Sequence, residues 1–371
     1  MNNKYTRFAL AAAVYTAFAV YLYRPYFKGF DSLRLQDLFV ANICLACLGA
    51  YVLSRRWVAG FAESFFAGAI YGFGPFALGL AKFHPSAGFL FAAIPWLFCP
   101  AVFGPEGKWK PLRVPLSLLP FLAIVLFFLL SARFGLYPIP IKLKLHGAEM
   151  AGLLAPLVAA KRNMTLVGFY HIPLASLIMG FSMLLVPLRL VFSRASSSLG
   201  MKTPLHPERS RRVSIIEGLA VRRLGIVAIF TVATILAFCD SFMDISPIIF
   251  LAISTLCCSV LIGAGMQGLI SAGPADRRWV LLTAILLGIL AIVTLLFATK
   301  YFQTAAGLGA GTGRLLTETA KMYILGAVAV AMLFVIARAK LRIHPVRQIL
   351  LYATMALDIF LGARFIVDTI L

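Results

Sequence analysis

Long apolar runs alternate along the whole chain with short segments that carry lysine and arginine. A helix needs about 20 apolar residues to cross the hydrocarbon layer of a membrane, where unpaired backbone groups are costly. Runs of this kind predict about eleven spans, at 8–23, 36–54, 58–81, 87–104, 114–132, 165–188, 224–242, 246–270, 279–299, 322–338 and 350–370. The pattern therefore predicts an all-α, polytopic transmembrane bundle.

Composition supports the same class. The 371 residues are 61% hydrophobic and only 13% charged, with a mean hydropathy of +0.95. Soluble domains are closer to half apolar and a quarter charged, so the bilayer must be the solvent of this chain. The net charge of +21 is divided among short loops, which favours membrane topology over nucleic-acid binding. We expect a multi-pass protein of the plasma membrane, with the lipid bilayer as its partner and no nucleic acid.

The positive charges predict an orientation, because cytoplasmic loops retain excess lysine and arginine. If the N-terminus is cytoplasmic, 21 of the 34 basic residues fall on the cytoplasmic side and 13 on the outer side. This bias favours a cytoplasmic N-terminus. It depends on the segment near 145–162, which is too short in its apolar part to span and is expected to be re-entrant or interfacial.

One sizeable polar linker divides the chain. Residues 194–223 are rich in arginine and serine and are predicted to form a basic cytoplasmic linker. The linker separates a six-span half at 1–193 from a five-span half at 224–371. Repetition between the two halves is not apparent, which lowers the expectation of an inverted-repeat transporter.

Ionisable residues inside predicted spans are candidates for function, because a charge in lipid costs several kcal/mol. Asp358 lies near the middle of the last span, His171 lies in the sixth span before Pro173, and Glu63 lies near the inner end of the third. Asp358 fits either a structural bond between helices or a proton or ion relay. His171 fits either a satisfied core histidine or a residue that lines a cavity.

Two glycine patterns suggest local structure. Gly68-x-x-x-Gly72 predicts a close contact between helices, since small residues let two backbones approach. The glycine-rich stretch at 307–313 precedes Arg314 and superficially resembles a phosphate cradle, without the strand and the Gly-Lys-Ser/Thr end that a nucleotide loop needs. A flexible outer loop is one interpretation, and a site where backbone amides beside Arg314 bind an anionic head group is the other.

The stretch at 46–103 resembles the helix hairpin of polytopic C-type (GT-C-like) membrane glycosyltransferases and their bacterial relatives. In those chains a span ends in Leu-Gly-Ala-Tyr and two arginines, followed by Gly-x-x-Tyr-x-Phe-x-Pro-Phe, an outer histidine and a Pro-Trp or Pro-Leu step. The matching positions here are Gly49, Ala50, Tyr51, Arg55, Arg56, Gly68, Tyr71, Phe73, Pro75, Phe76, His84, Pro95 and Trp96.

The resemblance implies a chemistry at the outer face. In that family an acid of the first outer loop acts as catalytic base or metal contact, and the donor is a sugar linked to polyprenyl phosphate. Asp31 occupies the corresponding place, with Asp37 behind it and His84 as a supporting polar group. A catalytic role would leave room for a divalent metal as cofactor. Three basic residues would hold the phosphate as point charges: Arg24, Lys28 and Lys82.

Three functions remain open from the sequence. The first is a glycosyltransferase-like protein that acts on a lipid-linked substrate at the outer face. The second is a transporter or permease whose path is lined by Asp358, His171 and Glu63. The third is a non-catalytic membrane assembly protein whose basic linker binds anionic lipid or a partner.

Overall fold

The computed structural model describes a helical protein. The described residues are 4–26, 39–56, 58, 60–83, 85–103, 122, 126, 170–181, 225–238, 247–272, 276–305, 312–338 and 344–370. Within these ranges the secondary structure is helical and contains no strand. The predictions at 114–132, 145–162 and 194–223 fall outside the described ranges, except for Leu122 and Leu126.

Six helices in the described ranges are long and apolar enough to cross a membrane, and the protein is therefore a helical membrane protein. They are Tyr5–Tyr26, Phe61–Lys82, Phe250–Ser271, Arg277–Phe297, Thr312–Arg338 and Pro345–Asp368. Four shorter apolar helices lie at Phe39–Ser54, Gly88–Cys99, His171–Phe181 and Gly225–Phe238. The predicted total of eleven spans stays a prediction.

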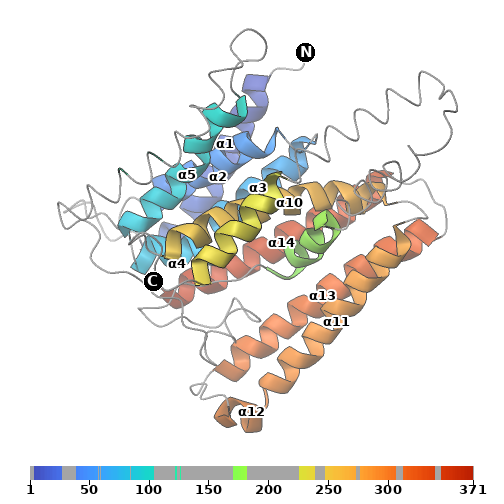
Figure 1. Cartoon of the computed structure of the whole chain (residues 1–371). Helices are drawn as coiled ribbons and strands as arrows, with labels where there is room; N and C mark the ends of the chain where they lie inside the picture. Colours follow the sequence, from blue (N-terminus) through green and yellow to red (C-terminus); the bar gives the residue numbers. More distant parts are fainter. Residues whose placement is uncertain are drawn as a thin grey trace, which may run out of the picture.

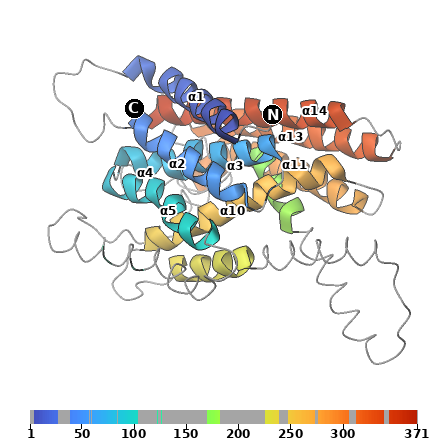
Figure 2. The same ribbon diagram turned by 90° about the horizontal axis from the view of Figure 1, so that it is seen from above.

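The helices form a core and an adjoining hairpin (Figures 1 and 2). The elements are α1 (Lys4–Tyr23), η1 (Arg24–Tyr26), α2 (Phe39–Ser54), α3 (Phe61–Phe73), α4 (Pro75–Phe83), α5 (Pro85–Phe103), α10 (Pro247–Ser271), α11 (Arg277–Phe297), α12 (Lys300–Ala305), α13 (Thr312–Arg338) and α14 (His344–Ile370). Helices α11 and α13 pack closely against each other as the hairpin. Helix α14 contacts α13 on one side and α1, α3, α4 and α10 of the core on others.

Arginines that the sequence places on one side of the membrane lie at one end of the bundle. Arg277 at the start of α11 donates through Nη2 to the carbonyl of Arg338 at the end of α13 (3.5 Å). Arg347 in the first turn of α14 donates through Nη1 to the carbonyls of Ile270 (3.3 Å) and Ala272 (2.9 Å), at the end of α10. These bonds satisfy carbonyls that a helix end leaves free. This end is called the arginine end below.

Two predicted spans contain local detail that the sequence did not predict. The run at 58–81 is confirmed as an apolar span at Phe61–Lys82, and its helix is broken at Gly74, which has an extended backbone (φ −64°, ψ 157°) between α3 and α4. Pro75 then starts α4, at a position where its missing N–H is tolerated. Of the run at 165–188 the structure describes residues 170–181, where Tyr170 is not helical and a helix begins at His171.

Glycines set the closest helix contacts. Added side-chain carbons at Gly68 and Gly72 of α3 would collide with Cys47 of α2, which confirms the close contact that the Gly-x-x-x-Gly pattern predicts. A carbon at Gly265 of α10 would collide with the backbone of Ser176 in the His171–Phe181 helix. That helix is therefore held tightly against α10.

We predict that Gly265→Ala destabilises the protein, because its new methyl group meets backbone that cannot turn away. Overpacking of this kind lowers the free energy of unfolding by about 1–3 kcal/mol. The measurement is the thermal midpoint of the full-length protein in detergent, taken as the temperature at which half of the monodisperse species is lost. Gly288→Ala in α11 is the matched control, since a carbon there meets nothing within 4 Å. Equal midpoints for the two variants would contradict the close contact.

Candidate functional site

A histidine and an aspartate from distant parts of the chain meet inside the bundle. His171 Nδ1 lies 2.7 Å from Asp358 Oδ1, and both side chains are fully buried. Asp358 stands near the middle of α14, so the pair lies at the depth of the membrane interior. The sequence singled out both residues separately, and the structure brings them together.

Asp358 also caps the helix that begins at His171. The carbonyl of Tyr170 accepts the first helical bond, from the N–H of Leu174 (3.3 Å), which makes Tyr170 the cap residue. Pro173 has no N–H, and the N–H of Ile172 donates to Asp358 Oδ2 (2.9 Å). A carboxylate at a helix N-terminus is stabilised by the N–H groups and the positive end of the helix dipole. Asp358 therefore supplies, from another helix, the acceptor that this helix start needs.

The break between α3 and α4 lies next to the start of the His171–Phe181 helix. Because the helix breaks at Gly74, the carbonyl of Phe73 loses the N–H of Ala77 as its regular partner. The hydroxyl of Tyr170 donates to this carbonyl at 2.6 Å, and Tyr170 is fully buried. Tyr170 thus joins the break between α3 and α4 to the start of the His171–Phe181 helix.

The hairpin reaches the pair through α13. The Tyr323 ring packs edge to face against the His171 ring, with centroids 4.3 Å apart. Gly326, one turn further along α13, faces the side chain of Ile172. The pair therefore lies where α13, α14 and the His171–Phe181 helix converge.

Glu63 lies nearer the arginine end and has a different partner. It is 7% exposed, and its Oε1 accepts a hydrogen bond from the hydroxyl of Tyr352 on α14 (2.7 Å). The Tyr352 ring also stacks against Phe66 of α3. Glu63 thus joins α3 to α14 at a separate level from the His171–Asp358 pair.

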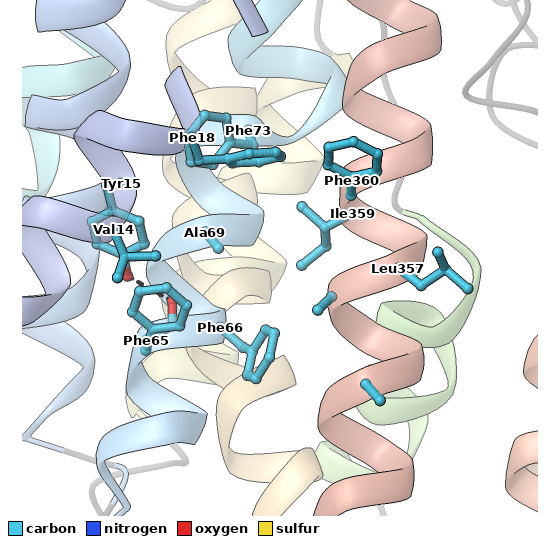
Figure 3. A pocket seen from close by; sticks show the side chains of 12 residues that line it. Val14, Tyr15, Phe18, Phe65, Phe66, Ala69, Phe73, Leu357, Ile359 and Phe360 are labelled. Atoms are coloured by element: carbon cyan, nitrogen blue, oxygen red, sulfur yellow. Dashed lines mark hydrogen bonds between the residues drawn. The ribbon is translucent and has the colours of Figure 1, made fainter. Parts of the chain in front are cut away.

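An apolar groove of about 510 Å³ opens between α1, α3 and α14 (Figure 3). Residues of α3 lie between those of α1 and α14 in this view. Twelve residues line the groove: Val14, Tyr15, Phe18, Phe65, Phe66, Ala69, Phe73, Ala353, Ala356, Leu357, Ile359 and Phe360. The hydroxyl of Tyr15 is the single polar side-chain group among them, and it donates to the carbonyl of Phe65 at 2.6 Å.

Three of the predicted outer residues are described. Arg24 is exposed in η1, directly after α1, and Lys82 lies near the end of α4, so both stand at the end of the bundle opposite the arginine end. Arg314 belongs to α13, which begins at Thr312, and is exposed; this corrects its expected place in a flexible loop. Four candidates fall outside the described ranges: Lys28, Asp31, Asp37 and His84.

Polar contacts join elements at the same end of the bundle, opposite the arginine end. Arg364 Nε donates to Asp368 Oδ2 at 2.8 Å, across one turn of α14. Tyr26 donates to Asp368 Oδ1 at 2.7 Å and ties η1 to the end of α14. Across the described residues, no group of three His, Cys, Asp or Glu side chains is arranged to hold a metal ion.

Comparisons with known proteins give no assignment: no family model, no curated protein and no solved structure matches the chain. The functional reading therefore rests on the chain's own residues.

Sequence reasoning missed three residues that complete these contacts. Tyr323 contacts His171, Tyr352 bonds to Glu63, and Arg347 caps α10. Tyrosines and arginines near span ends are common, so nothing in the sequence distinguishes these three. The one available signal was Pro173, which is tolerated in the first turn of a helix and so fits the helix start at His171.

We predict that Tyr170→Phe lowers the free energy of unfolding by about 1–3 kcal/mol, because it leaves the buried carbonyl of Phe73 without a donor. The measurement is the thermal midpoint in detergent. Tyr301→Phe is the matched control, since Tyr301 on α12 is 76% exposed and should tolerate loss of its hydroxyl. An unchanged midpoint for Tyr170→Phe would show that the carbonyl does not depend on this hydroxyl.

Proposed function

We propose that this membrane protein binds a lipid-linked substrate, with the hydrocarbon chain of the lipid in the groove between α1, α3 and α14. The observation that carries the proposal is the groove itself. It lies between helices that are long and apolar enough to cross the membrane. Ala353, Ala356 and Leu357 on its α14 side are exposed, so the groove is open to the surrounding lipid.

The lining suits a hydrocarbon chain. Aliphatic and aromatic side chains line the groove, and the Tyr15 hydroxyl already donates to a backbone carbonyl. A ligand with polar groups would leave those groups without hydrogen bonds in the groove, which costs binding free energy. A long isoprenoid or acyl chain avoids that cost, and its contact with Phe18, Phe73 and Phe360 adds dispersion attraction.

One ionisable residue beyond each end of the groove bears on the direction of the lipid. Toward the arginine end this residue is Glu63 of α3, which bonds to Tyr352 and would be a poor neighbour for an anionic head group. At the other end, Arg24 follows Phe18 by six residues, about 9 Å along the helix axis. A phosphate head group near Arg24, with its chain in the groove, satisfies both conditions. We therefore assign the substrate head to the predicted outer face.

Transfer of a sugar from such a lipid is the finer part of the proposal. It draws on the resemblance to C-type glycosyltransferases and assigns Asp31 as base, with Asp37 and His84 beside it. Its test is sugar transfer from a polyprenyl-linked donor in membranes, which Asp31→Asn should abolish. Unchanged transfer by Asp31→Asn would overturn that assignment and leave lipid binding in place.

Transport is the second candidate, and one observation favours it. His171 and Asp358 form a fully buried pair at the start of the His171–Phe181 helix and near the break between α3 and α4, and transporters use such helix ends for coupling ions. Asp358 of the pair and one wall of the groove belong to α14. The groove residues Leu357 and Ile359 flank Asp358 in the sequence.

We predict that two variants separate chain binding from head-group binding. Ala356→Trp fills the groove and should lower retention of both polyprenyl phosphate and the neutral polyprenol. Arg24→Gln should lower retention of the phosphate alone, by roughly 5-fold to 10-fold, because it removes one charge-assisted contact worth about 1 kcal/mol or more. The measurement is native mass spectrometry of the purified protein after incubation with each lipid.

Val328→Trp on α13 is the control for added bulk, since Val328 is 47% exposed and lies outside the groove. It should retain both lipids as the unaltered protein does. Equal retention by Ala356→Trp would overturn the groove as the binding site.

A further inference from the structure

The polar centre of the bundle has an incomplete set of hydrogen bonds. Asp358 accepts from Ile172 N–H through Oδ2 and contacts His171 Nδ1 through Oδ1. Among the described residues, the other ring nitrogen of the histidine, Nε2, has no hydrogen-bond partner although it is buried. A buried polar atom without a partner needs an explanation, because leaving it unpaired costs free energy.

The proton positions follow from the chemistry of the two groups. An ionised carboxylate only accepts hydrogen bonds, so the Nδ1 that lies 2.7 Å away carries a proton and donates it. In a neutral imidazole the proton on Nδ1 leaves Nε2 with a lone pair. The pair then has a net charge of −1 in the interior of the membrane protein, offset in part by the helix N-terminus at Ile172.

We propose that His171 Nε2 is the proton-binding atom of an intramembrane site formed by His171 and Asp358. Addition of one proton to the Nε2 lone pair forms an N–H bond and breaks none. It converts a neutral imidazole beside a carboxylate into an imidazolium–carboxylate pair, whose net charge is zero. Neutralisation favours proton uptake, because an uncompensated charge in a low-dielectric interior is costly.

The surroundings fit a proton better than a metal cation. Among the described residues, Asp358 is the one carboxylate in contact with His171, and a metal ion would need more oxygen or nitrogen ligands than this pair supplies. The other titratable groups near the pair are tyrosines from three directions: Tyr170 on the same helix, Tyr323 on α13, and Tyr23 of α1 beside Tyr170. None of these three carries a charge near neutral pH.

The site also joins several helices. Asp358 is the trans cap of the His171–Phe181 helix, and the His171 ring contacts Tyr323 of the hairpin. Proton binding at His171 therefore takes place at a contact between the hairpin and the core.

The test is solid-state NMR of the full-length protein, labelled with ¹⁵N-histidine and reconstituted in lipid, over a pH series. His171→Gln assigns the His171 resonances among the five histidines of the chain. We expect Nδ1 to stay protonated while Nε2 passes from unprotonated to protonated as the pH is lowered, within about pH 5 to 8. Asp358→Asn removes the carboxylate that stabilises the imidazolium, so its titration midpoint should fall by at least about one pH unit.

Asp368→Asn is the matched control: it makes the same change on the same helix, at a carboxylate that is 40% exposed. It should leave the His171 titration unchanged. The proposal is overturned if the unaltered protein keeps one protonation state of His171 across the series. This outcome is read from the spectra of the unaltered protein, so it does not depend on whether the Asp358 variant folds. It is also overturned if folded Asp358→Asn titrates as the unaltered protein does. Lipid retention in the groove plays no part in either readout.

Discussion

The need to satisfy backbone groups where helices break inside the membrane governs the centre of this protein. Hydrocarbon offers no hydrogen bonds, so each carbonyl or N–H that leaves a helix ladder needs a partner from the protein. Tyr170 supplies a donor for the carbonyl of Phe73, and Asp358 supplies an acceptor for the N–H of Ile172. The break at Gly74 and the helix start at His171 are stable because side chains from other parts of the chain supply the missing hydrogen bonds.

The same constraint recurs away from the centre. Pro95 has no N–H, so the carbonyl of Phe91 in α5 lacks its regular partner four residues on. The hydroxyl of Tyr71 donates to that carbonyl at 2.6 Å, and the Tyr71 and Phe91 rings stack. Buried tyrosines in this bundle therefore act as hydrogen-bond donors to interrupted helices as well as packing groups.

Much of the fold follows from the sequence, because span length and loop charge are local properties. Apolar runs predicted the positions of α1, α2, α5, α10, α11 and α14 to within a few residues at most ends. The break at Gly74 and the helix start at His171 were not predicted, since a proline in an apolar run can either kink a helix or end it. Which outcome occurs depends on whether a distant side chain can satisfy the freed groups.

The candidate site was predictable by residue type and not by pairing. His171 and Asp358 stood out because ionisable residues are rare in apolar runs, yet 187 residues separate them and nothing local brings them together. Their contact depends on helix packing at glycines such as Gly265 and Gly362, which let the His171–Phe181 helix approach α10 and α14. The groove was not predicted at all, because it depends on how three helices diverge.

Polar contacts fix α14 at four successive depths. From the arginine end they involve Arg347, Tyr352, Asp358 and Asp368, each bonded to a different part of the core. Helix α14 cannot tilt or slide without breaking several of these hydrogen bonds at once. Displacement of α14 would therefore break its contacts with α10, α3, the start of the His171–Phe181 helix and η1 together.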